Sequence, residues 1–288
     1  MSQSCYLRWR IASNGSQNSL AERNKLHGRQ IPWKIRLKSK TSPASIRCRR
    51  QRHELDSAIT VDNRNGTEER QLMSSPNNYL TRLYRRYLDT EVSADFIRSV
   101  ASFYSLSTLH RIAMCGDRES RRAAMLAVTF IGDHRSFETI GYGLIDEDRA
   151  VRLLAEDGSR SVWHRGGTKG AQHALNVVMR HICAQQLDEA IDLGTKIIEA
   201  NPSYAEAYNQ RAIAYFEAEQ LYDAMADCQH VMELNPYHFP AATGLGHRSM
   251  ECGDLTSAIE HFQHALRICP DLEYVRSQID MLQRSEGA

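Results

Sequence analysis

The residues in this chain that could do chemistry include three histidines near its C-terminus. His261 and His264 lie three positions apart, and His247 lies one predicted helix earlier. Side chains three apart share one face of a helix, so these imidazoles could approach one another as metal ligands. No further ligand stands at a usual spacing, and histidines are common on helix surfaces. We therefore predict no metal site.

Other motifs were tested for catalysis and for phosphate binding. No serine or cysteine lies in an elbow-like turn with a base and an acid identifiable in the sequence. The GGTKG stretch, Gly166 to Gly170, lacks the Walker spacing and follows no predicted strand, so it is interpreted as a flexible joint. Trp163-His164-Arg165 is interpreted as a packing tryptophan at a charged helix end. We predict no catalytic residue and no cofactor, and hence a protein that is not an enzyme.

The elements that must position any binding residue are organised by an internal repeat. Pro202, Pro236 and Pro270 are 34 residues apart and define the units 171–204, 205–238 and 239–272. A fixed period of this length indicates stacked two-helix units. Residues 273–288 follow with Val275, Ile279 and Leu282 on one face, as expected for a helix that closes such an array.

The repeat resembles the tetratricopeptide repeat (TPR) family, whose pattern places small and large residues at fixed positions. The second unit carries the pattern at Tyr208, Arg211, Ala212, Tyr215, Ala224 and Cys228, the third at Ala242, Leu245, Gly246, Ser249, Ala258, Phe262 and Ala265, and the first, more weakly, at Ala174, Val177, Val178, His181, Ala190 and Gly194. The resemblance implies an all-α fold, a right-handed α-α superhelix whose first helices line a concave groove.

The same resemblance assigns a peptide-binding groove. Its predicted residues are Asn176, Met179, Glu206, Asn209, Gln210, Ile213, Phe216, Glu217, His247, Met250 and Glu251. The family's carboxylate clamp needs cations where this chain has Leu175, Met179, Pro240 and Gly244, so that activity is not expected. An apolar floor edged by glutamates predicts an unidentified protein or peptide partner with apolar anchors and basic flanks. Packing within the array is the alternative for some of these side chains, Ile213 among them.

A different repeat precedes the first. Ser120 to Ala127 and Ala150 to Asp157 align at a spacing of 30, and Asp146, Asp148 and Arg152 carry the rest of the motif. This pattern resembles HEAT-like repeats, in which an acidic residue and an arginine tie one turn to the next. We therefore predict a HEAT-like helical module over 76–165, beginning at the Ser75-Pro76 helix-start signal.

Charge divides the chain as strongly as the repeats do. The net charge is +9 over residues 1–72, +2 over 73–170 and −10 over 171–288. Residues 1–74 are predicted to be a disordered basic tail, with Arg47, Arg49, Arg50 and Arg52 as its densest cluster. This tail could have no specific role, reflect a start assigned before Met73, act as a transit leader, or bind nucleic acid. It could also occupy the groove of its own acidic repeats.

The cysteines and the hydropathy pattern suggest a compartment. The seven cysteines form no CxxC pair, which favours a reducing, cytoplasmic location. No stretch reaches the roughly 20 apolar residues that cross a bilayer, so no membrane partner is predicted. The sequence therefore predicts a non-enzymatic adaptor or scaffold that binds a peptide in the TPR groove. Two alternatives stay open, a nucleic-acid platform using the tail and a HEAT-like lyase acting on a chromophore.

Overall fold

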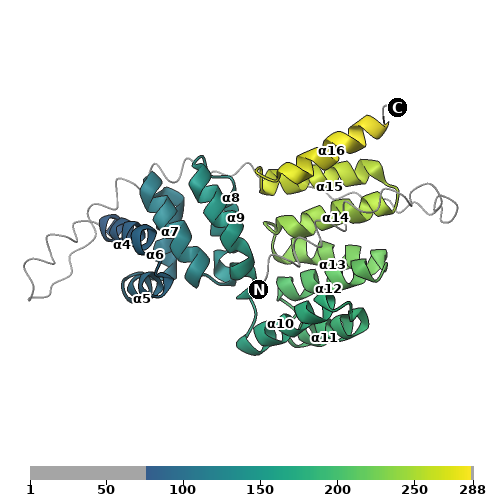
Figure 1. Ribbon diagram of the computed structural model, residues 1–288, viewed down its shortest axis with the longest axis horizontal. Coiled ribbons are helices and arrows are strands. Elements are labelled where there is room, and N and C mark those ends of the chain that lie inside the picture. The colour runs from purple at the N-terminus through teal and green to yellow at the C-terminus, as the bar shows by residue number, and fades with distance from the viewer. Residues whose placement is uncertain (1–75, 287–288) are drawn as a thin grey trace, which may run out of the picture. The chain divides into compact units, whose positions relative to one another are not determined.

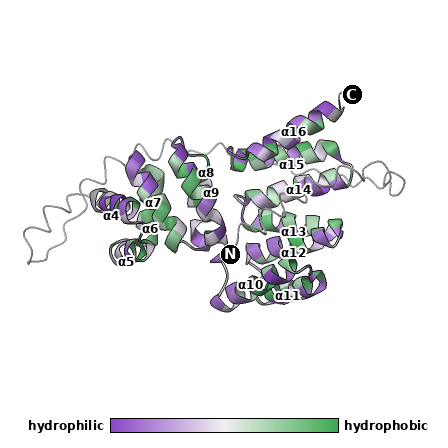
Figure 2. Ribbon diagram, viewed as in Figure 1, coloured by the Kyte–Doolittle hydropathy of each residue, from purple (hydrophilic) through white to green (hydrophobic). Residues whose placement is uncertain are grey.

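The computed structural model describes residues 76–286, which form thirteen α-helices and one 3-10 helix (Figure 1). No β-strand occurs between these residues, so the predicted all-α solenoid is confirmed for this part of the chain. Figure 2 shows hydrophilic and hydrophobic residues alternating along the helices, as expected of amphipathic segments. The basic tail lies outside the described residues, together with its possible roles in nucleic-acid binding, start assignment, targeting and groove blocking.

The first six helices form what we call the N-terminal module. They are α4 (Pro76–Thr90), α5 (Ser93–Phe103), α6 (Leu106–Cys115), α7 (Arg118–Ile131), α8 (Phe137–Leu144) and α9 (Arg149–His164), with the 3-10 helix η2 (His134–Ser136) before α8. Helix α7 packs against α4, α5, α6 and α9, and its Ala123, Ala124 and Val128 are fully enclosed. Small side chains on this central helix let its neighbours approach closely.

Capping side chains set the helix starts in this module. Ser105, Asp117 and Asp148 each accept hydrogen bonds from backbone N–H groups in the first turn of the helix that follows. These bonds satisfy donors that a helix leaves without an intrahelical partner. The short connections between helices therefore end where the sequence supplies a cap.

The following seven helices form what we call the repeat block. They are α10 (Lys169–Cys183), α11 (Leu187–Ala200), α12 (Ala205–Glu217), α13 (Leu221–Leu234), α14 (Phe239–Glu251), α15 (Leu255–Ile268) and α16 (Glu273–Glu286). Each helix packs against the next along the chain. Ala212 and Ala224, small residues of the repeat pattern, are fully enclosed, and α16 closes the block with Val275 buried against α15.

The turn inside each repeat uses a left-handed residue. Gln185, Glu219 and Gly253 stand 34 residues apart and have φ angles of 59°, 61° and 78°. A left-handed residue commonly ends a helix, and glycine adopts it at the lowest cost. The three turns are thus equivalent in conformation although only the third has a glycine.

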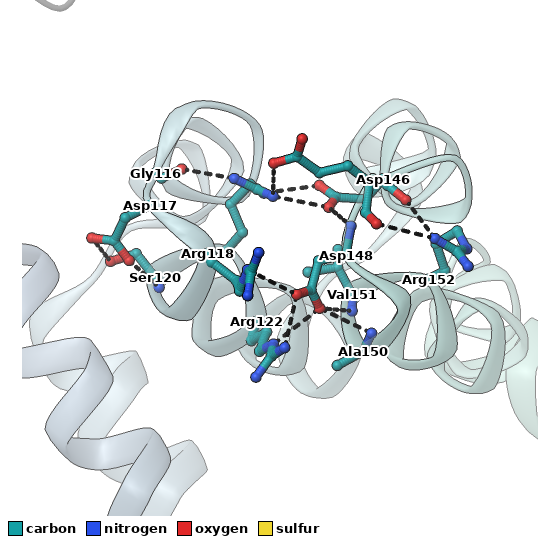
Figure 3. A network of polar contacts seen from close by, with 12 residues as sticks. Gly116, Asp117, Arg118, Ser120, Arg122, Asp146, Asp148, Ala150, Val151 and Arg152 are labelled. Carbon is teal, nitrogen blue, oxygen red and sulfur yellow. Dashed lines mark hydrogen bonds and ion pairs between the residues drawn. The ribbon is translucent and has the colours of Figure 1, made fainter.

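A ladder of arginine and aspartate side chains runs through the N-terminal module (Figure 3), and it continues into the repeat block through Arg152 and Asp271. Arg121 on α7 donates to both carboxylate oxygens of Asp146 at 2.9 and 3.0 Å. Arg152 on α9 donates to Asp271 at 2.8 Å, in the turn that precedes α16. The arginine–aspartate contact between successive turns that the sequence predicts is present. The last of these contacts, between Arg152 and Asp271, joins the N-terminal module to the repeat block.

Candidate functional site

The first helices of the repeats, α10, α12 and α14, have two ends with different surroundings. The covered end is our name for the turns 201–204, 235–238 and 269–272 together with the first turns of α12 and α14. The open end is our name for the turns 184–186, 218–220 and 252–254 together with the last turns of α10, α12 and α14. Most residues in these latter turns are exposed. The predicted groove residues are distributed between these two ends.

Helix α9 covers the first of these ends. Tyr204 and His238 hold the last position of their 34-residue units, and both meet the C-terminal part of α9. The Tyr204 hydroxyl donates to the His164 carbonyl at 2.6 Å, and the ring centroids of His238 and Trp163 are 4.1 Å apart. Arg152, near the start of α9, reaches the next turn through its ion pair. One helix therefore contacts three successive inter-repeat turns.

Close packing from the N-terminal module supports this docking. Trp163 is 2% exposed and also meets Phe239 edge-to-face, with ring centroids 5.5 Å apart. The ring of Tyr237 lies so close to Gly141 on α8 that a Cβ atom at 141 would collide with it. The aromatic residues of the 237–239 connector thus pack against α8 and α9.

A buried polar network lies at the covered end. One carboxylate oxygen of Glu206 accepts hydrogen bonds from Asn209 at 3.1 Å and Gln210 at 2.7 Å. The other accepts from His238 Nε2 at 3.1 Å, while His238 Nδ1 accepts from the backbone N–H of Ala241. That second bond assigns the histidine proton to Nε2. Both oxygens of the buried carboxylate are therefore satisfied.

The electrostatics of Glu206 follow from these partners. Burial by itself raises the pKa of this carboxyl group. The hydrogen bond that His238 donates, together with the two amide hydrogen bonds, outweighs burial and leaves the pKa of Glu206 below its ordinary value. The ionised glutamate is thus a stable part of the fold, and it links α12 to the start of α14.

The predicted groove residues separate according to the end at which they lie. Glu206, Asn209, Gln210 and His247 are buried, Asn176, Met179, Ile213, Phe216, Glu217 and Met250 are half-buried, and Glu251 is exposed. That Glu206, Asn209 and Gln210 contact a peptide stays a prediction, but the structure gives them an internal partner set. Asn176 Oδ1 accepts a hydrogen bond from His164 Nε2 of the N-terminal module at 3.1 Å.

The predicted groove residues at the open end are half-buried apolar residues with acidic neighbours, and we call this part of the predicted concave surface the open half. Met179, Ile213 and Phe216 belong to none of the three hydrophobic core clusters, whereas Ile182 and Met250 pack against a core. Glu217 and Glu251 end helices α12 and α14. This surface could accept apolar side chains beside cationic ones.

Metal chemistry was examined at the histidines. No group of three or more histidine, cysteine, aspartate or glutamate side chains in the described part of the chain could hold a metal ion. His261 and His264 are half-buried, and burial lowers the pKa of each. These two residues therefore present at most a pair of neutral imidazoles.

The GGTKG stretch is a structured connector between α9 and α10. Thr168 accepts a hydrogen bond from the backbone N–H of Ala171 and so caps α10. Gln172 donates to the Gly167 carbonyl at 2.7 Å. These bonds fix the path from the N-terminal module to the first repeat.

Two features of the site were not found from the sequence. The Glu206–His238 pair joins residues 32 positions apart, and neither residue type signals the other. Arg248, in the last turn of α14, is 4% exposed and was not among the predicted groove residues. The one signal that could have located it is Gly244, a residue without a side chain one helical turn earlier.

The fold and this surface define a helical-repeat protein whose repeat block is similar to tetratricopeptide repeat proteins. No protein-family model matches the sequence. The chain is 26% identical to a TPR repeat-containing protein of Rhizobium etli over 137 residues, which are 48% of this chain and 66% of that protein. It is 28% identical to tetratricopeptide repeat protein 33 of Xenopus laevis over 82 residues, covering 28% of this chain and 32% of that protein.

These relatives support the tetratricopeptide resemblance, and the chain spans just under two thirds of the first and about one third of the second. Among solved structures, one similar to this chain is the first TPR of Spaghetti (RPAP3) bound to HSP90 peptide SRMEEVD. The match covers 41% of the present chain and 94% of the chain in that structure. Its identity is 22% and its TM-score 0.40, which is too low to support an argument about function. The HEAT-like interpretation of the N-terminal module gains no support from these proteins.

Membrane spanning was considered separately. Between residues 76 and 286, every helix is too short or too polar to cross a lipid bilayer.

Proposed function

We propose that this protein is a non-enzymatic, cytoplasmic adaptor that binds a peptide segment of a partner protein on the open half of its concave surface. The N-terminal module, which we propose to be HEAT-like, acts as a fixed support for the repeats. The peptide lies extended or helical across α10, α12 and α14. Its apolar side chains contact the floor, and its basic flanks face the glutamates.

The observation that carries this proposal is the position of Met179, Ile213 and Phe216. These apolar side chains are half-buried, and none of them packs against a core cluster. They lie on successive first helices, and apolar anchors at that spacing suit a peptide with alternating side chains. Glu217 and Glu251 stand beside them and favour cationic neighbours.

The covered end supports the proposal by restricting where a peptide can lie. Glu206, Asn209 and Gln210 are enclosed and hydrogen-bonded to one another, so a peptide that reached them would have to replace these bonds. The open half demands no such rearrangement. We therefore place the peptide over the last turns of the first helices.

The test compares substitutions on the two faces of the repeat block. A Met179→Lys, Ile213→Lys variant is expected to lose the partner proteins that the wild-type protein captures, because two cations replace apolar contacts. The control is Tyr222→Lys on α13, where the side chain is 73% exposed and away from the concave surface. Partners are identified by affinity capture and then by crosslinking from position 213. If the double variant folds and retains every partner of the control, the proposal is wrong.

A further inference from the structure

The floor of the open half contains a buried cation. Arg248 is 4% exposed, and its Nη2 donates to the Ala212 carbonyl at 2.9 Å. The guanidinium carbon lies 4.9 Å from the centre of the Phe216 ring. A carbonyl and an aromatic face are the contacts that hold this charge between α12 and α14.

Two other partly buried arginines, Arg121 and Arg211, are paired with carboxylates. Arg121 forms an ion pair with Asp146 at 2.9 Å, and Arg211 forms one with Asp227 at 2.8 Å. Arg248 takes part in none of the ion pairs between described residues, although its side chain is enclosed. A buried charge is costly unless it is paired, so the absence of a counter-charge is unusual.

Arg165 provides the closest comparison, because it too has no carboxylate partner. It donates to two backbone carbonyls, of Gly132 at 2.7 Å and of Thr129 at 2.6 Å, where α7 ends. Those carbonyls are the partners that a helix C-terminus offers to a cation. Arg248 makes only one such bond, and its Nε atom is enclosed without any partner.

The unpartnered atom distinguishes Arg248 from the rest of the interior. Three enclosed side-chain atoms in the described part of the chain have no hydrogen-bond partner, and the other two, Trp163 Nε1 and Asn235 Nδ2, belong to neutral groups. Nη1 of Arg248 also makes no hydrogen bond but is not among the enclosed atoms, so it meets the surface. An incoming anion would reach the guanidinium there.

The local sequence makes room for this guanidinium. A Cβ atom at Gly244 would lie 2.5 Å from Arg248 Nη1 and 3.3 Å from the sulfur of Cys228. The guanidinium therefore occupies space above Gly244 that any other residue at 244 would fill. Since Gly244 and Phe216 are both at positions that line the groove in the repeat pattern, the charge is placed at the floor of the groove.

The neighbours respond to this charge but do not neutralise it. Burial, and then the charge of Arg248, lower the pKa of His247 to about 4, so this histidine is neutral near pH 7. Burial raises the pKa of the Cys228 thiol, with Arg248 acting in the opposite direction, so the thiol stays protonated. Neither group supplies a negative charge.

We propose that Arg248 is the anchor for the carboxylate of an acidic side chain in the bound peptide. The carboxylate accepts a hydrogen bond from Nη1 and supplies the counter-charge that the fold lacks. Glu217 and Glu251 then contact basic residues on either side of it. This inference rests on the proposed groove and specifies its ligand as a peptide with an acidic residue between basic ones.

A small carboxylate tests the anchor without a peptide. The melting temperatures of the wild-type protein, Arg248→Met and the exposed Arg267→Met control are measured in sodium acetate and in sodium chloride at equal ionic strength. Acetate raises protein stability over chloride without specific binding, so some rise is expected in all three proteins. We expect the rise in the wild type and in the control to exceed that in Arg248→Met by about 2 °C, because only these two proteins can bind acetate at Arg248. An equal rise in all three proteins overturns the inference.

Partner capture separates this inference from the proposed function. Arg248→Met is expected to lose the partners that Met179→Lys, Ile213→Lys loses, while Arg248→Lys retains them in part. If Arg248→Met keeps all of them, the groove stands and the carboxylate anchor is wrong. If only the double variant keeps them, the proposed floor is wrong and the acetate result still decides the anchor. Circular dichroism confirms that each variant is folded.

Discussion

The covered and open ends of the same three helices each contain a buried charge, and the two charges differ in how many polar partners they have. At the covered end, Glu206 has a partner for each carboxylate oxygen and lies beneath α9. At the open end, Arg248 has one carbonyl partner, an aromatic face and an enclosed nitrogen with none. Both residues are buried to a similar extent, so burial alone does not separate them.

The difference between the ends shows which of the two buried charges has its partners within the chain. Buried polar groups in native proteins are satisfied in the great majority, and the exceptions call for an explanation. At the covered end the buried charge of Glu206 meets this rule through contacts inside the chain, while two atoms of neutral groups there, Trp163 Nε1 and Asn235 Nδ2, have no partner. The open end violates it at Arg248, and a ligand from outside would restore it.

The largest expected change in stability comes from removing the Trp163 side chain at the covered end. Trp163→Ala removes the ring that packs on His238 and Phe239 and leaves a cavity between α9 and the repeats. We expect the free energy of unfolding to fall by about 3–5 kcal/mol in urea denaturation. Leu153→Ala on the same helix is the control, because that side chain is 41% exposed. A loss below about 1 kcal/mol would show that α9 docking contributes little.

A smaller effect is expected from the charge that the covered end satisfies. Glu206→Gln should lower the free energy of unfolding by about 1–3 kcal/mol at pH 7, since a charged acceptor in a satisfied network is lost. The folded-state pKa of Glu206 is below its ordinary value of 4.5, so its stabilisation is complete above that pH and is lost as pH falls through the folded value.

The measurement for this prediction is the difference between the two proteins from pH 7 to pH 3. The gap between wild type and Glu206→Gln should be constant down to about pH 4.5 and then narrow. Other carboxyl groups titrate equally in both proteins and cancel. A gap that widens in acid would mean that burial, not His238, dominates the pKa of Glu206.

The smallest expected change in stability comes from a substitution at Gln185, in a turn of the open end and outside the proposed peptide-binding residues. Gln185 has a φ angle of 59° in the first intra-repeat turn, where Gly253 stands in the third. Gln185→Gly should raise the free energy of unfolding by about 0.5 kcal/mol, because glycine adopts this conformation without steric cost. Ala184→Gly, with a φ of −88°, is the control and should be destabilising. Thermal denaturation measures both, and equal signs would refute the explanation.

The sequence predicts the repeats better than it predicts what covers them. The 34-residue period places α10 to α15 because each helix pair repeats the same local pattern. Trp163 was interpreted as a packing residue, which is confirmed by its burial, but its partner His238 lies 75 positions away in the chain. Contacts at such separations depend on how the module docks, which no local pattern encodes.

The same limit explains the distribution of the groove residues. Glu206, Asn209 and Gln210 stand at positions that the repeat pattern places in the groove, but the structure buries them and gives Glu206 a partner in His238, from the turn before α14. For Arg248 the reverse holds, because its guanidinium lies in space that a side chain at Gly244 would fill.

Docking of α9 across three inter-repeat turns has a consequence for how this protein can evolve. Arg152 and Trp163 are eleven residues apart on α9, so about 17 Å of rigid helix separates the contacts with Asp271 and His238. Repeat proteins commonly gain or lose whole units, because each unit contacts only its neighbours. Here deletion of the unit 239–272 would remove Asp271 and with it the ion pair that joins the start of α9 to the repeats.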